Sequence, residues 1–146
     1  MKDHRQLAHY VAFGLLLCAT TYAQATQASP PPPLSVTLGQ KHLQLIDHQG
    51  RCALSEPDQR LRMLEMAWPC QFGPDKHGNA RVEMFNNTPI VLVMRNEREP
   101  APGTNCLAQT QALRLIKGKL EASERMDTAG CGYGADQKVY VGLFDW

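Results

Sequence analysis

The chain lacks any concentration of charge of one sign. Its 15 lysines and arginines face 14 aspartates and glutamates, and no more than two adjacent residues carry the same charge. Binding to nucleic acid or to an anionic membrane surface depends on clustered basic side chains. The composition therefore argues against a nucleic-acid partner.

The sequence also lacks the motifs of common hydrolases. No Gly-x-Ser-x-Gly element is present, although that element carries the nucleophile of many serine hydrolases. Beyond residue 25 the only serines are Ser29, Ser35, Ser55 and Ser123. We therefore predict no catalytic residue and no cofactor, and we favour a binding module over an enzyme.

Metal-ligand spacing is absent as well. No Cys-x-x-Cys pair occurs, although structural zinc sites commonly use one. If the strand that begins at His42 continues to His48, the six residues span about 20 Å, too far for a single ion. If the chain turns at His48, the distance is shorter but no ligand motif emerges. His77, taken with Asp47 or Asp75, completes no ligand motif. We predict no metal site.

Three glycines flank Cys131 in a Gly-x-Gly-x-Gly run, at Gly130, Gly132 and Gly134. A phosphate cradle of this kind needs a strand before it and a helix after it, because helix amides bind the phosphate. Residues 138–144 read instead as a strand. We therefore expect a turn that carries a disulfide.

The amino-terminal residues have the three parts of a secretory signal peptide. Lys2 and Arg5 precede a short apolar segment, and an Ala-x-Ala site follows at Ala23 and Ala25. The apolar segment is shorter than the roughly 20 residues that a membrane span needs. We expect residues 1–25 to be a signal peptide whose removal leaves 13 basic and 13 acidic residues.

A stiff spacer and a single domain follow the signal peptide. Pro30 to Pro33 favour an extended polyproline conformation with no backbone donors. We therefore predict a proline-rich spacer over residues 26–33 and one β-rich domain over residues 34–146. The predicted location is periplasmic or secreted, with no membrane span in the mature chain.

Four of the five cysteines lie beyond the signal peptide. An even number of cysteines in an exported chain normally forms disulfides. Three pairings are open, and we favour Cys52 with Cys70 and Cys106 with Cys131 because each closes a modest loop. Each bridge should stabilise the fold by roughly 3 kcal/mol.

Short alternating or apolar segments between turn residues predict a mainly β domain. The run 90–94 is apolar throughout, which indicates a central strand covered on both faces. The expected strands are residues 36–38, 42–47, 51–54, 61–72, 80–85, 90–94, 111–116, 119–124 and 138–144. We predict a small disulfide-stapled antiparallel β-sandwich or barrel-like domain, with room for one short helix.

Residues 61–72 contain the richest run of large apolar side chains in this domain. Their spacing fits a strand with one change of phase, which a β-bulge produces. Ser55 could instead cap a helix over the same residues, so both readings stay open and we favour the strand. In that reading Cys70 pins the strand to Cys52, and Trp68 is a packing residue.

The longest polar stretch is residues 95–105, which includes Pro100 and Pro102. We expect it to be the largest loop and a candidate contact surface, since loops on rigid scaffolds tend to carry function. The favoured function is a small exported binding protein with a protein partner in the cell envelope. Envelope inhibitors and immunity proteins share this size and compartment.

Two other functions stay open: a small envelope hydrolase that uses Asp and His, and a carbohydrate-binding module. The residues Leu43, Leu45, Asp47, Gly50 and Cys52 resemble the opening hairpin of a ricin-type β-trefoil repeat. The resemblance covers ten residues of one repeat, with no Gln-x-Trp after it and no second copy. It implies carbohydrate binding, for which the stacking platforms would be Trp68, Tyr133 or Trp146.

Overall fold

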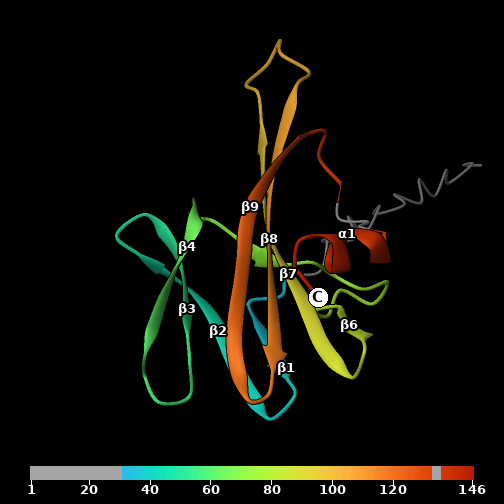
Figure 1. Cartoon of the computed structure of the whole chain (residues 1–146). Helices are drawn as coiled ribbons and strands as arrows, with labels where there is room; N and C mark the ends of the chain where they lie inside the picture. Colours follow the sequence, from blue (N-terminus) through green and yellow to red (C-terminus); the bar gives the residue numbers. More distant parts are fainter. Residues whose placement is uncertain (1–30, 133–135) are drawn as a thin grey trace, which may run out of the picture.

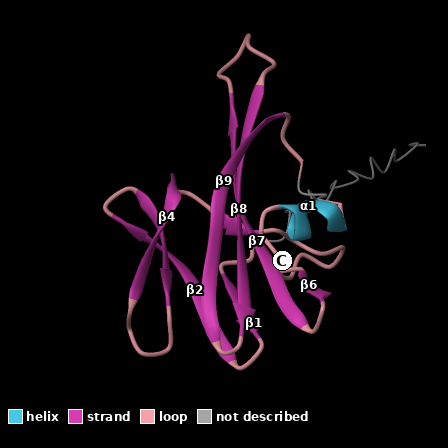
Figure 2. Cartoon of the chain, viewed as in Figure 1, coloured by secondary structure: helices cyan, strands magenta, loops and turns pink. Residues whose placement is uncertain are grey.

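The computed structural model describes residues 31–132 and 136–146. The predicted signal peptide, residues 1–25, lies outside the described residues, and so do residues 26–30 of the predicted spacer. The described part is mainly β, with two antiparallel sheets, two disulfides and one short helix (Figures 1 and 2). The predicted fold class is confirmed.

The first sheet contains the first four strands in chain order, each antiparallel to the next. They are β1 (Ser35–Leu38), β2 (Lys41–His48), β3 (Arg51–Ser55) and β4 (Leu61–Ala67). Tight turns join the first three strands. Gly39 and Gly50 lie in these turns at φ values of 61° and 78°, a conformation that glycine adopts without steric cost.

The second sheet is built around one long strand, β7, which pairs with β5, β6 and β8. Strand β9 lies beyond β8 at the edge of the sheet. The strands are β5 (Gln71–Phe72), β6 (Val82–Phe85), β7 (Thr88–Arg98), β8 (Cys106–Ile116) and β9 (Lys119–Ala129). The two sheets do not close into a barrel, so the sandwich alternative is the correct one.

The main core lies between the two sheets. Leu43, Leu54 and Leu64 from the first sheet pack in one cluster with Val91 and Val93 of β7. All five side chains are fully buried. Because successive side chains of a strand point to opposite faces, the intervening residues of β7 must be covered by something else.

That cover is the helix α1 (Gln137–Gly142) and the residues after it. Ile90, Leu92 and Met94 of β7 form a second buried cluster with Tyr140 of α1. The apolar run 90–94 is therefore covered on both faces, as predicted. The short helix and the first sheet lie on opposite faces of the second sheet (Figure 2).

The predicted strand over residues 138–144 is wrong, because this segment forms α1 and a turn. The alternation of Val139 and Val141 suggested a strand, but six helical residues are too few to show a helical period. Asp136 caps the helix, since its Oδ1 accepts a hydrogen bond from Lys138 N at 3.0 Å. Trp146, which follows the helix, donates from Nε1 to the carbonyl oxygen of Val141 in its last turn at 2.8 Å.

Residues 61–72 are not one strand, and that prediction is corrected. β4 ends at Ala67, a cis peptide bond joins Trp68 to Pro69, and β5 begins in the other sheet. Proline has no backbone donor, so it ends the ladder with β3. The strand reading over the helix is correct for β4. The expected change of phase is not seen in its burial, because Leu64 and Met66 are buried and Leu61 and Met63 are exposed in regular alternation. The register shift between β3 and β4 adds two residues to β4 and so keeps the phase.

Candidate functional site

Three strands of the second sheet extend beyond the body of the domain, the part in which the two sheets pack together. β7, β8 and β9 have 11 residues each, and one half of each strand extends past the first sheet as a projecting hairpin with β9 beside it (Figure 1). We call this part, residues 95–109 and 125–131, the arm.

The predicted loop over residues 95–105 is wrong in extent. β7 continues to Arg98 and pairs with β8 from Arg95 opposite Gln109 to Arg98 opposite Cys106. Hydropathy could not reveal these strands, because an exposed hairpin needs no apolar alternation. Only residues 99–105 form the loop, so the candidate contact surface is a β-hairpin with a short tip.

The tip is ordered by its own hydrogen bonds. Glu99 N donates to Asn105 O at 2.9 Å, and Gly103 N donates to Pro100 O at 2.9 Å. A Cβ atom on Gly103 would clash with the Glu99 side chain, so the turn packs tightly on that residue. Pro100 and Pro102 further restrict the backbone.

A disulfide closes the arm where β8 begins. Cys106 is bonded to Cys131, and Gly130 N donates to Cys106 O at 2.6 Å. The second disulfide joins Cys52 to Cys70 and lies in the main core. Both pairings are those favoured from the sequence.

One face of the arm carries two ion pairs of the same kind. Arg95 pairs with Glu97 on β7, and Arg125 pairs with Asp127 on β9 at 2.7 Å. The pKa of Glu97 lies below its ordinary value because Arg95 donates a hydrogen bond to it and adds a favourable charge. Leu107 lies between these pairs on β8 and is 59% exposed.

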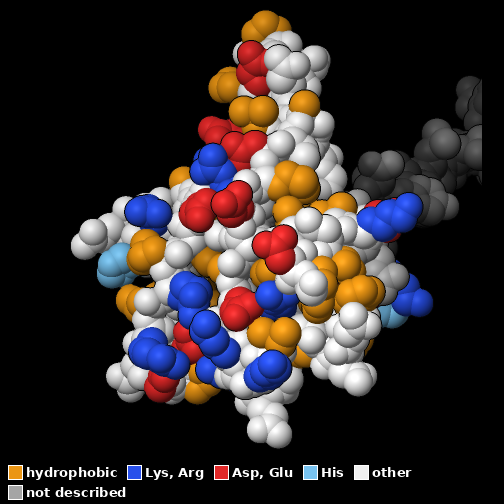
Figure 3. All heavy atoms as spheres, viewed as in Figure 1, with side chains coloured by type: hydrophobic (Ala, Val, Ile, Leu, Met, Phe, Trp, Pro, Cys, Tyr) orange, Lys and Arg blue, Asp and Glu red, His pale blue; other side chains and the backbone are white. Residues whose placement is uncertain are grey.

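Two open hollows adjoin this face. The hollow beneath the tip measures about 820 Å³ and includes Glu99, Pro100 and Leu107 in its lining. The hollow at the root of the arm measures about 580 Å³ and includes Arg51 and Arg95. Figure 3 shows acidic side chains where the arm leaves the body, and Lys and Arg over the lower part of the same face.

The histidines considered from the sequence lie at separate places on β2 and in the turn after β5. His42 and His48 lie towards opposite ends of β2, opposite Thr37 and Arg51 respectively. His77 lies in the turn after β5, where its backbone N donates to Asp75 Oδ1 at 2.8 Å. Within residues 31–132 and 136–146, no three His, Cys, Asp or Glu side chains are grouped so that they could hold a metal ion.

The reason for setting aside a phosphate cradle at the glycine run was wrong, because a helix follows it. That helix, α1, has only six residues. Its own cap, Asp136, already accepts the hydrogen bond from Lys138 N, in the position where an anion would bind. Gly134 lies outside the described residues.

Trp68 and Trp146, two of the three aromatic residues proposed as stacking platforms, contact other side chains of the protein. Trp68 is half-buried against the main core. Trp146 contacts the ring of Phe85 edge-on at 4.7 Å between centroids, and the Arg114 guanidinium lies 4.9 Å from its ring. Tyr133 lies outside the described residues.

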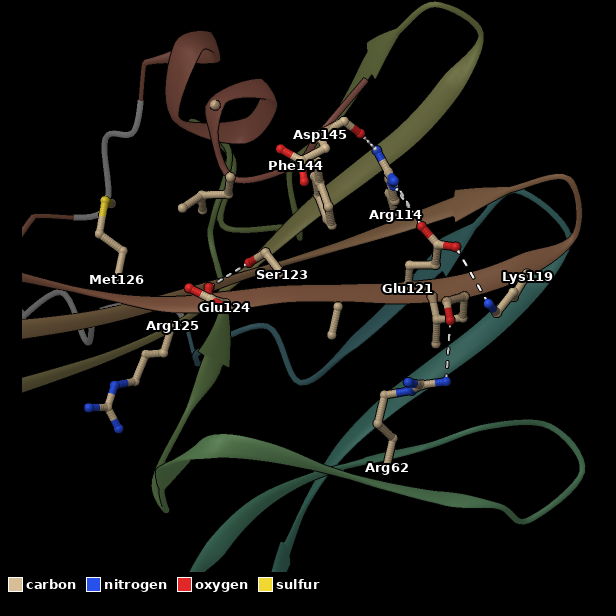
Figure 4. Close-up of a pocket in the computed structure, with 14 residues that line it drawn as sticks. Arg62, Arg114, Lys119, Glu121, Ser123, Glu124, Arg125, Met126, Phe144 and Asp145 are labelled. Atoms are coloured by element: carbon tan, nitrogen blue, oxygen red, sulfur yellow. Dashed lines mark hydrogen bonds and ion pairs between the residues drawn. The ribbon is translucent and has the colours of Figure 1, made fainter.

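A third hollow, of about 820 Å³, runs along the outer side of β9 (Figure 4). On one side of β9, Arg62 Nη2 donates to Leu120 O at 3.2 Å. On the other side, Arg114 pairs with Glu121 at 2.9 Å and donates to Asp145 O at 3.0 Å. Of these two arginines, only Arg62 connects the first sheet to β9. Arg114 lies with Ile90 and Phe144 on the face of the second sheet that α1 covers.

Comparison with known proteins yields no relative. No protein-family model matches the chain, and neither a curated protein nor a solved structure matches it. None of the helices in the described part of the chain has the length and apolarity needed to cross a membrane. Any function must therefore be argued from the chain itself.

Sequence reasoning missed the arm as a structured element, although a signal was present. Arg95 and Glu97, like Arg125 and Asp127, are opposite charges two residues apart. In a strand this spacing places both side chains on one face. Such pairs in a stretch without apolar alternation indicate an exposed strand.

Proposed function

We propose that this protein is a small exported binding protein that engages a protein partner in the cell envelope through the tip and one face of the arm. The observation that supports this proposal is a projecting hairpin that is stapled by a disulfide and ordered by its own hydrogen bonds. The protein resembles envelope inhibitors and immunity proteins only in its size and in its proposed compartment.

A preordered hairpin suits binding because ordering has already occurred before the partner arrives. Association is opposed by the entropy lost when loops and side chains are fixed, and a rigid loop loses less. The tip contains two prolines and a turn closed by Gly103 N and Pro100 O. Its shape is therefore largely set in the free protein.

The chemistry of the arm favours a partner cleft with an apolar floor and a polar rim. Pro100, Ala101 and Pro102 are exposed at the tip, and Leu107 is exposed on the face below it. Charged side chains, including Glu97 and Glu99, surround these apolar residues. An apolar centre with a polar periphery is the usual anatomy of a protein contact surface.

Two features support export. The amino-terminal residues have the pattern of a signal peptide, and two disulfides are typical of proteins from oxidising compartments. We therefore place the mature protein in the periplasm or outside the cell.

The proposal is tested by capture from envelope extracts with two matched variants. Leu107→Ser changes an exposed leucine on the arm, and Leu61→Ser changes an exposed leucine on the body, 46% exposed. Wild type and Leu61→Ser should recover the same stoichiometric protein, and Leu107→Ser should recover at least about tenfold less, as expected for loss of a central anchor. Equal recovery by both variants, or repeated recovery of no partner by wild type, would refute the proposal.

A further inference from the structure

The outer edge of β9 offers unpaired backbone groups in the arm, and the hydrogen-bond pattern identifies them. Gly130 N donates to Cys106 O, so alternate residues of β9 below Gly130, namely Met126 and Thr128, turn their backbone groups towards β8. Arg125, Asp127 and Ala129 then turn their N–H and C=O groups away from β8.

These three residues are exposed. Within the described part of the chain, no residue hydrogen-bonds to their backbone groups. An open strand edge of this kind is a template for another strand. The upper part of β9 can therefore accept a partner strand.

The lower part of the same edge is closed. Leu120 O accepts a hydrogen bond from Arg62 Nη2 of β4 at 3.2 Å. Figure 4 shows Arg62 reaching β9 at this point. A register shift between β8 and β9 lies just above it. Pairing is thus limited to the part of β9 that lies in the arm.

We propose that the occupant of this edge is β9 of a second copy of the chain, paired antiparallel about a twofold axis at Met126. In this register Arg125 lies opposite Asp127 of the second copy, and Asp127 lies opposite Arg125 of the second copy. Both residues present outward backbone groups, so the two pairs form four backbone hydrogen bonds. Opposite charges also face one another across the new ladder.

Charge selects this register over its neighbours. The neighbouring registers that also pair outward-facing backbone groups about a twofold axis have that axis at Arg125 or at Asp127. They place Arg125 opposite Arg125 of the second copy, or Asp127 opposite Asp127 of the second copy. Like charges directly opposite each other destabilise an antiparallel pair. The edge is therefore complementary to itself in one register.

The two arms of such a dimer point in opposite directions, because the paired strands are antiparallel. Each tip stays free to contact its own partner. A pairing this short buries little area, so the dimer is weak and depends on protein concentration. It goes beyond the binding role proposed above and does not rest on it.

Cysteine crosslinking of the full mature protein tests the register. Met126 is the only β9 position that faces itself, at about 4.5 Å between Cα atoms, a separation that a disulfide spans. Met126→Cys should form a disulfide-linked dimer about tenfold faster than the control Thr128→Cys, which faces Glu124 of the second copy. Equal rates for the two variants would overturn the proposal.

Charge reversal gives a second readout that does not require a new cysteine. Asp127→Arg should weaken dimerisation by about tenfold in sedimentation equilibrium, because arginines then face each other twice. The double variant Arg125→Asp with Asp127→Arg should restore it, with folding checked by circular dichroism. A wild type that stays monomeric up to millimolar concentration, or a double variant as weak as the single one, would contradict the pairing.

Discussion

The same three strands are stabilised in two different ways along their length. In the body, β7 is buried between the first sheet and α1, with Leu92 and Val93 fully buried on opposite faces. In the arm, β7 continues with Glu97 and Arg98 exposed. There the strands are joined by backbone hydrogen bonds, surface ion pairs and the disulfide between Cys106 and Cys131.

This difference assigns the stability of the fold to the body and the proposed contact surface for a partner to the arm. Burial of apolar area is the main favourable term in folding, and in this protein it is concentrated in the body. The arm adds little burial, but its hairpin is ordered and exposed. A surface of this kind can vary in sequence for binding with little effect on the free energy of unfolding.

Two leucines on β8 test the comparison most strongly. Leu113→Ala should lower the free energy of unfolding by about 2–5 kcal/mol, because the residue is fully buried in the main core. Leu107→Ala, on the exposed arm, should change it by less than about 0.5 kcal/mol. Urea unfolding of both variants measures the difference, and equal losses would show that the arm belongs to the core.

The two disulfides give the next largest contrast. Removing Cys52–Cys70 by double substitution to alanine should cost about 3 kcal/mol or more, because the bridge closes an 18-residue loop and both sulfurs are buried. Removing Cys106–Cys131 should cost less in global unfolding, since the arm can open while the body stays folded. Urea unfolding ranks the two variants, and the reverse order would break the comparison.

Buried and exposed carboxylates should also differ. Glu56 is buried in the body and pairs with Lys41 at 3.2 Å and Arg60 at 3.5 Å. Glu56→Ala should lower the free energy of unfolding by about 1–3 kcal/mol, because these cations lose their acceptor. Glu97→Ala, at an exposed pair on the arm, should give no resolvable change, and a loss equal to that of Glu56→Ala would contradict this.

The smallest effects concern pH, and they have opposite signs in the two regions. The lowered pKa of Glu97 means that its stabilising pair with Arg95 is present above its ordinary pKa and is lost as pH falls through the folded value. In the body, burial raises the pKa of Tyr140, and the Arg81 charge opposes this. The folded state then holds this proton more tightly, so stability falls as pH rises above about 10.

Carbon NMR of the Glu97 carboxyl and phenolate absorbance, with Tyr140→Phe as the reference, follow these titrations. Titration of either group at its ordinary pKa would contradict the corresponding environment.

Much of the fold could be predicted from the sequence because its strands obey simple rules. Short alternating segments between turn residues indicated the strands of the first sheet, and the apolar run 90–94 indicated a central strand. The even cysteine count, with short loops, favoured the pairings that the structure contains. Each of these features depends on residues that are close in sequence, so it does not require knowledge of distant contacts.

The remaining elements depend on contacts that no local pattern encodes. Val139 and Val141 alternate like a strand, but their segment folds as a helix on the outer face of β7. The sequence of residues 61–72 reads as one strand, but the strand ends before Pro69 and the chain continues in the other sheet. The arm strands around Glu97 have no apolar pattern, and the free edge at Asp127 follows from pairing registers that sequence alone does not show.

Amide hydrogen exchange in the free protein tests the central claim, that the arm is ordered before any partner binds. The amides of Glu97 and Leu107, which face each other in the arm, should exchange more slowly than in a free peptide and faster than those of Val91 and Leu113 in the body. Exchange at the free-peptide rate in the arm would contradict the account, because such an arm would have no fixed shape to present.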